Sequence, residues 1–256
     1  MRAFLEFLKK EWLEISRTGK LWILGIICLV FGISNPAIAK LTPWLIEMMS
    51  EDLSELGMTV SKVVVNDLTS WTQFFKNASM ILIIFLIMFS GTITLEYEKG
   101  TLIPILTKGI HPYTILAAKT TMLFTGWTAV YWCAVGITYS YNDFFWGNVV
   151  AKHLVFALFG YYIFGVWMIA VLILMSSILH SNIGVLLGTS AVFGVDFVGR
   201  MFPKFANYFP GKLTASGELL VRVAEPKDYQ KSIVITMVLS MIMLGIGCYF
   251  IKKKKV

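Results

Sequence analysis

The stretch LVFALFGYYIFGVWMIAVLILMSSIL, residues 154–179, decides the class of this protein, because it contains no aspartate, glutamate, lysine, arginine or histidine. A helix needs about 20 consecutive apolar residues to cross the hydrocarbon core of a bilayer, and this run is longer than that. A helix also satisfies its backbone hydrogen bonds internally, as lipid requires. The stretch therefore predicts a membrane-spanning helix.

The overall composition agrees with a membrane protein. Hydrophobic residues make up 57% of the chain and charged residues 14%, whereas a soluble domain has roughly 45–50% and about 25%. The net charge is +7, but the basic residues flank apolar runs rather than forming one patch. This distribution argues against nucleic-acid binding.

Charged residues divide the rest of the chain into further candidate spans. A short polar group, His180 to Asn182, separates the quoted stretch from the next apolar run and favours a tight turn. The predicted fold is an all-α integral membrane protein with six transmembrane helices. Besides residues 154–179, the expected spans are Leu21–Ala39, Asn77–Leu95, Thr120–Asn142, Ile183–Arg200 and Ser232–Ile251.

The flanking charges predict the orientation. With the N-terminus inside the cell, the cytoplasmic segments hold twelve bases and five acids, and the external segments hold ten of each. An excess of basic residues on the inside is the usual bias. We therefore expect a multi-pass protein of the cell membrane with both termini in the cytoplasm.

Residues 1–20 are expected to form an amphipathic interfacial helix. Phe4, Leu8, Trp12 and Ile15 recur at helical spacing, with charged residues between them, as in a helix that lies along the headgroups. An ordinary membrane-proximal flank is the alternative. After the first span, a surface helix is expected in the external loop between Lys40 and Lys76.

Residues 96–112 form the connection between the second and third spans. Glu96, Glu98 and Lys99 follow directly on the membrane, Gly100 permits a turn, and apolar residues that include Leu102 and Leu106 come next. A short apolar segment with a charged start can dock into a groove on a soluble partner. An interfacial loop that touches headgroups explains the pattern equally well.

This connection resembles the coupling region of ABC-2 type transporter permeases. The residues that carry the resemblance are Glu98, Gly100, Thr101, Leu102, Leu106 and Lys119, and the start of the chain, with Glu11, Arg17 and Trp22, resembles the amphipathic elbow helix of that family. The chain departs from the family over Thr107–Pro112.

The resemblance implies a function. Such permeases form the pathway of an exporter and pair with a second permease copy or a related chain and with separate cytoplasmic ABC ATPase subunits. Glu96, Glu98, Lys99, Gly100, Thr101, Leu102 and Leu106 are then the expected ATPase-coupling residues. The cargo is expected to be hydrophobic or amphipathic, such as a peptide, a drug or a lipid.

No enzymatic site is expected in this chain. The sequence lacks GxxxxGK[ST], HExxH and GxSxG patterns, so we predict no catalytic, cofactor or metal residues and place ATP hydrolysis in a partner chain. A secondary transporter or channel that is not driven by ATP is the alternative function. Intramembrane charges or broken-helix repeats would favour it.

Two features near the fifth span carry further expectations. Gly184 and Gly188 form a GxxxG pair, which favours either a dimer interface or packing within the chain. Asp196 either contacts substrate or pairs with Arg200 one turn later. The family resemblance also implies short re-entrant helices within residues 200–231, before the last span.

Overall fold

The computed structural model describes residues 2–55, 65–101, 109–221 and 223–253, which form helices and no strands. The α-helices are α1 (Arg2–Arg17), α2 (Lys20–Glu55), α3 (Asp67–Phe89), α4 (Thr94–Glu98), α6 (Pro112–Trp146), α7 (Leu154–Ile178), α8 (Asn182–Arg200) and α9 (Pro226–Lys253). Two 3₁₀ segments, η1 (Ala206–Tyr208) and η2 (Pro210–Val221), connect α8 with α9. The predicted all-α architecture is thus confirmed for the described residues.

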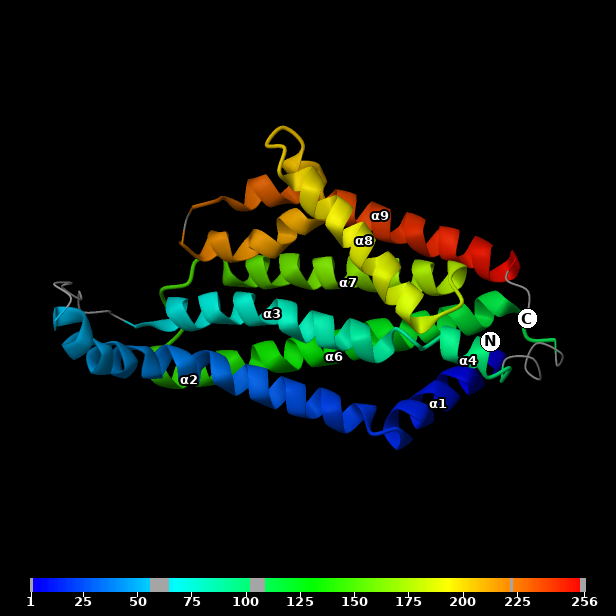
Figure 1. The fold of residues 1–256 in the computed structure, drawn as a ribbon, viewed down its shortest axis with the longest axis horizontal. Helices are drawn as coiled ribbons and strands as arrows, with labels where there is room; N and C mark the ends of the chain where they lie inside the picture. The colour runs from blue at the N-terminus through cyan, green and yellow to red at the C-terminus, as the bar shows by residue number, and fades with distance from the viewer. Residues whose placement is uncertain (1, 56–64, 102–108, 222, 254–256) are drawn as a thin grey trace.

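The long helices lie side by side along one axis, with α8 crossing α7 obliquely (Figure 1). The most extensive contacts join α7 to α9 and α2 to α6. The centre of the bundle is α7, which is buried on every side from Ile169 to Ile173. This explains its uninterrupted apolar sequence, since a helix that is apolar all round belongs in a core.

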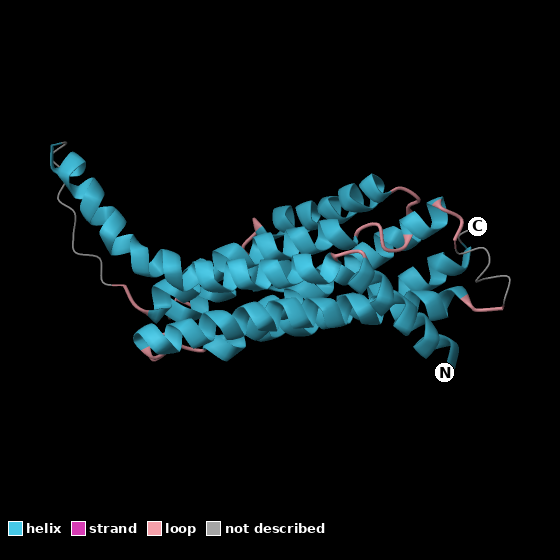
Figure 2. Ribbon diagram, turned by 90° about the horizontal axis from the view of Figure 1, so that it is seen from below, coloured by secondary structure: helices cyan, strands magenta, loops and turns pink. Residues whose placement is uncertain are grey.

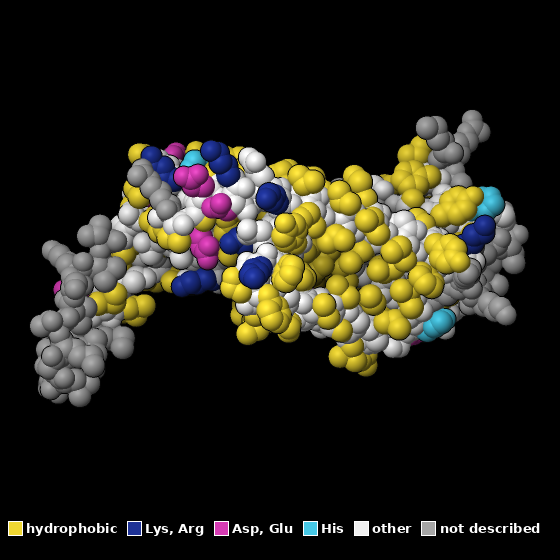
Figure 3. All heavy atoms as spheres, turned by 90° about the horizontal axis from the view of Figure 1, so that it is seen from above, with side chains coloured by type: hydrophobic (Ala, Val, Ile, Leu, Met, Phe, Trp, Pro, Cys, Tyr) yellow, Lys and Arg dark blue, Asp and Glu magenta, His cyan; other side chains and the backbone are white. Residues whose placement is uncertain are grey.

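Among the residues that the structure describes, five helical segments are long and apolar enough to cross a membrane: Lys20–Met48, Asp67–Glu98, Leu154–Ile178, Asn182–Arg200 and Pro226–Lys252. The fourth and fifth predicted spans agree with α7 and α8. Over α8 and α9, hydrophobic side chains cover the middle of the molecule, and charged ones gather toward one end of that face (Figure 3). These features fit helices that cross a bilayer.

The third expected span lies in α6, which is not among those five segments although it is 35 residues long. Its sequence includes several threonines, tyrosines and tryptophans, whose polar groups lower the hydropathy of the segment. Its buried face nevertheless belongs to the main core, with Trp127, Tyr131 and Ala134 fully enclosed.

The prediction that the first span ends near Lys40 is wrong. Helix α2 continues without a break to Glu55, through Pro36 and Pro43, and extends past the ends of its neighbours (Figure 2). Lys40 lies inside this continuous helix, because lysine is itself a good helix former, and its ammonium group lies 3.9 Å from the ring centroid of Phe145 on α6. The part of the expected external loop at residues 56–64 lies outside the described residues.

A buried polar network joins α2, α3 and α6 in the middle of the bundle. The side-chain amide of Asn35 donates to the hydroxyl of Thr138 at 3.2 Å, and the side-chain amide of Asn77 donates to Oδ1 of Asn35 at 2.7 Å. Asn35 and Thr138 are fully buried. Because polar side chains in such surroundings are stabilised by pairing with one another, this network fixes α2 against α6.

Candidate functional site

Helices α1, α4 and α6 meet at the end of the bundle where the chain begins (Figure 1). Helix α4 follows α3 directly and is the first part of the predicted coupling segment. At this junction a set of ionisable side chains from all three helices comes together. We name it the ion-pair cluster; its members are Lys10, Glu11, Glu14, Glu96 and Lys119.

Lys119 is the centre of the ion-pair cluster. Its Nζ lies 2.9 Å from Oε1 of Glu11 and 3.1 Å from Oε2 of Glu96. Lys119 is 1% exposed, Glu11 3% and Glu96 9%. A buried charge is tolerated only when it is paired. Lys119 therefore links α6 to α1 and α4 at once.

Lys10 supplies the second positive charge of the cluster. Its ammonium group forms a short hydrogen bond to Glu96 and lies 3.3 Å from Glu11 and 3.6 Å from Glu14. Burial lowers the pKa of Lys10, but the hydrogen bond to Glu96 and the three carboxylate charges outweigh it, so the pKa is raised above 10.5. Lys10 is thus fully charged at neutral pH.

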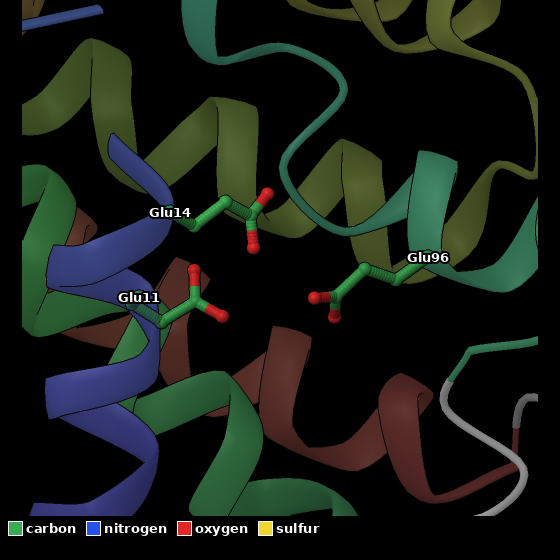
Figure 4. A group of neighbouring side chains, drawn as sticks. All are labelled: Glu11, Glu14 and Glu96. Atoms are coloured by element: carbon green, nitrogen blue, oxygen red, sulfur yellow. The ribbon is translucent and has the colours of Figure 1, made fainter. Parts of the chain in front are cut away.

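The carboxylates of Glu11, Glu14 and Glu96 point toward a common centre (Figure 4). One oxygen from each lies within 4.8 Å of the others, a spacing that a metal ion could bridge. The ammonium groups of Lys10 and Lys119 already hold Glu11 and Glu96 at hydrogen-bond distance, and Lys10 lies 3.6 Å from Glu14. The chemistry therefore favours a salt-bridge network over a metal centre.

The buried face of α1 differs from the predicted apolar stripe. Its buried residues are Phe7, Glu11 and Ile15, at four-residue steps, while Trp12 is 51% exposed. The predicted stripe placed Trp12 and Ile15 on one face. That stripe was expected to lie in the headgroups, and this placement stays a prediction. The face of α1 that packs against α6 includes Glu11, because Lys119 makes an acid favourable there.

The described residues of the predicted coupling set are buried, exposed or part of a turn. Glu96 is buried in the ion-pair cluster, and Glu98 and Lys99 are exposed. Gly100 has φ +64°, which confirms the predicted turn, and Thr101 closes that turn by donating its N–H to the Glu96 carbonyl at 3.1 Å. Leu102 and Leu106 lie outside the described residues.

Gly184 and Gly188 of α8 lie close to other parts of their own chain. A Cβ atom at Gly188 would lie 2.8 Å from Sδ of Met175 on α7, so glycine allows the two helices to approach here. A Cβ at Gly184 would lie 2.9 Å from the hydroxyl of Ser181, which caps the same helix. These contacts explain both glycines within one chain; their role in a dimer stays a prediction.

Asp196 pairs with Arg200, as one of the two interpretations of the sequence predicted. Its Oδ2 lies 3.2 Å from Nε of Arg200, and its Oδ1 accepts the N–H of Gly211 at 3.0 Å. Arg200 donates in turn to the Gly211 carbonyl at 2.7 Å. The pair thus fastens the start of η2 to α8.

Sequence reasoning singled out Glu11, Glu96 and Lys119 separately but did not join them, and it missed Lys10. One signal was available. Glu11 stands four residues from Phe7 and from Ile15, so an acid interrupts an apolar helical face. Such an acid predicts a basic partner on the neighbouring element.

Comparison with known proteins adds the membrane class. The chain is 23% identical over 236 residues, 90% of its length, to a Bacillus subtilis (strain 168) protein described as the uncharacterized transmembrane protein YxlG, of which 89% is covered. No family pattern and no solved structure matches the chain. Together with its apolar helices, this similarity identifies a multi-pass membrane protein.

Proposed function

We propose that this chain is the transmembrane permease subunit of an ATP-driven exporter of the ABC-2 type. The observation that carries the proposal is the ion-pair cluster. It connects α4, which opens the segment similar to a coupling helix, to α1 and α6 through Lys119. ATP hydrolysis then takes place in a separate cytoplasmic subunit that docks beside Glu98 and Lys99.

The cluster supports force transmission. In a buried setting, separating Lys119 from Glu11 or Glu96 leaves an unpaired charge, which is strongly unfavourable. A displacement of α4 is therefore transmitted to α1 and α6 rather than absorbed by a sliding contact. An ATPase that pushes on α4 at the exposed Glu98 would in this way displace the spanning helices.

Six spans, with α6 as the third, fit this role. Helix α1 begins and α9 ends at the same end of the bundle as α4 (Figure 1), as an even number of crossings requires. The excess of bases at the chain ends and in the coupling segment supports a cytoplasmic location for this end. Within this proposal η1 and η2 are the re-entrant helices on the outer side.

An apolar cavity of about 410 Å³ supports a hydrophobic or amphipathic cargo. It lies between α3, α7, α8 and η2, and its lining includes Leu86, Tyr161, Phe164 and Phe193. Helix α8 also exposes Ile183 and Leu187, so its outer face is available to lipid or to a second permease. Gly184 and Gly188 belong to the same helix and remain the candidate dimer residues.

The proposal is tested by purifying the chain in mild detergent from membranes of the cells that make it and measuring ATP hydrolysis. We expect an ATP-hydrolysing subunit to co-purify with the chain. Glu98→Lys should lower the recovered ATPase activity without preventing membrane insertion. Glu225→Lys is the matched control, because Glu225 is also exposed but lies beside the start of α9.

Two results would overturn the proposal. The first is the absence of any ATP-hydrolysing partner, together with substrate movement that follows an ion gradient. The second is equal loss of ATPase recovery in Glu98→Lys and Glu225→Lys.

A further inference from the structure

Two cavities adjoin at the end of the bundle that holds the ion-pair cluster. The first, of about 290 Å³, is lined by the cluster itself together with Lys20, Lys99 and Thr101. We name it the charged chamber. The second, of about 260 Å³, runs between α1, α2 and α6; we name it the apolar groove. The two share Ile15, Phe89 and Met122 in their linings, so the chamber borders directly on the groove.

The charged chamber is lined by more positively charged than negatively charged side chains. Four lysines and three glutamates line it. The three carboxylates already pair with Lys10 or Lys119. Within the part of the chain that the structure describes, no carboxylate lies within 4 Å of Lys20 or Lys99. The chamber can therefore attract a negative group without breaking an existing ion pair.

Lys20 stands where the chamber meets the groove. Its Nζ lies 5.2 Å from the ring centroid of Phe89, one of the shared lining residues. Beyond that point the groove is apolar, with Leu24, Cys28 and Val130 in its lining. Trp12 lines the groove and is 51% exposed, as is typical of an aromatic residue at a membrane interface.

The required ligand has a negative head beside an apolar chain. A free anion would leave the groove empty, and a neutral hydrocarbon would leave Lys20 and Lys99 without a counter-charge. The two volumes together fall within the range of roughly 300–1,000 Å³ that is usual for ligand sites. A phospholipid matches both halves and is present wherever the spanning helices are.

We propose that the charged chamber and the apolar groove together bind a phospholipid with an anionic headgroup. The phosphate is held by Lys20 and Lys99, and one acyl chain lies along the groove between α2 and α6. This inference goes beyond the proposed function, and it does not depend on an ATPase partner. It places a lipid in contact with α1, α2 and α6 beside the ion-pair cluster.

Native mass spectrometry of the purified chain tests the proposal, with phosphatidylglycerol and phosphatidylcholine as probes. Phosphatidylglycerol should bind more tightly. Lys20→Gln and Lys99→Gln should each weaken its binding roughly tenfold, which corresponds to the loss of one charge-assisted contact. Lys204→Gln is the control: it removes the same charge from an exposed residue outside both cavities and should leave binding unchanged.

A groove-filling variant tests the acyl-chain half separately. Gly25 lines the groove, and a Cβ atom there would have no neighbour within 4 Å. Gly25→Leu therefore fits the fold and favours helix, yet it should reduce phosphatidylglycerol binding with both lysines intact. The melting temperature of each variant without added lipid verifies its folding.

Three results would overturn the proposal: equal binding of the two lipids, equal behaviour of Lys20→Gln and Lys204→Gln, or unchanged binding in Gly25→Leu. Displacement of phosphatidylglycerol by inorganic phosphate alone would also contradict it, because the site would then be one for free anions. Persistence of lipid binding in Glu98→Lys would support a lipid site that is independent of ATPase coupling.

Discussion

Replacement of Lys119 by methionine is the sharpest test of the ion-pair cluster. Methionine keeps the length of the side chain but removes the charge that faces Glu11 at 2.9 Å and Glu96 at 3.1 Å. Removing one partner of a buried ion pair costs about 3–5 kcal/mol. Lys10 remains to neutralise part of the charge, so we expect a loss near the lower end, about 3 kcal/mol.

The assay is the free energy of unfolding of the purified chain in mixed micelles, measured by denaturant titration of tryptophan fluorescence. A matched variant carries Glu11→Gln and Glu96→Gln in addition to Lys119→Met. It should recover part of the lost stability, because uncharged polar groups are less costly to bury than unpaired carboxylates.

Two outcomes would refute this reasoning. If Lys119→Met lies within about 0.5 kcal/mol of the native chain, as a surface substitution would, Lys119 does not hold the three helices together. If the triple variant is less stable than Lys119→Met alone, the cost does not come from uncompensated charge.

Further predictions concern packing, the outer ion pair and pH. Gly165→Ala should lower the unfolding free energy by about 1–3 kcal/mol, because its Cβ would lie 2.3 Å from the buried Trp127 ring. Gly245→Ala is the control and should leave the stability unchanged, because a Cβ there has open space around it. Equal shifts of the melting temperature in the two variants would contradict this prediction. Asp196→Ala should lower the unfolding free energy by about 1.5–3 kcal/mol, since it breaks the contacts to Arg200 and Gly211; an equal loss in the exposed Asp143→Ala would contradict the pairing. The pKa of Lys10 is raised, so its stabilising contribution is complete below pH 10.5 and declines as pH rises through the folded-state pKa. The difference in unfolding free energy between the native chain and Lys10→Gln should therefore be constant from neutral pH to about pH 9 and shrink above pH 10.5. A difference that disappears below about pH 9 would refute this expectation.

The spans were the part of the fold that charge spacing could predict. Residues 154–179 and 183–200 were placed to within one residue of the ends of α7 and α8, because long apolar runs have few alternatives to a helix in lipid and the polar group at residues 180–182 marks the turn between them. The end of α2 was missed at Lys40. A lysine is a good helix former, so its charge does not by itself end a helix, and α2 continues through it to Glu55.

The candidate site was predictable in its parts and not as a whole. Glu96 and Gly100 were singled out from the local pattern, and Gly100 has the backbone conformation of the turn that it predicted. Glu11 and Lys119 are 108 residues apart in the chain. Only the packing of α1 against α6 joins them, and no local sequence pattern encodes that contact.

A photo-crosslinking amino acid at position 98 in living cells tests whether the α4 end of this chain docks an ATPase in the cytoplasm. We expect an adduct with a protein that contains a GxxxxGK[ST] phosphate-binding loop, and no such adduct from position 225. An adduct formed only with extracellular proteins, or the same ATPase adduct from both positions, would contradict it.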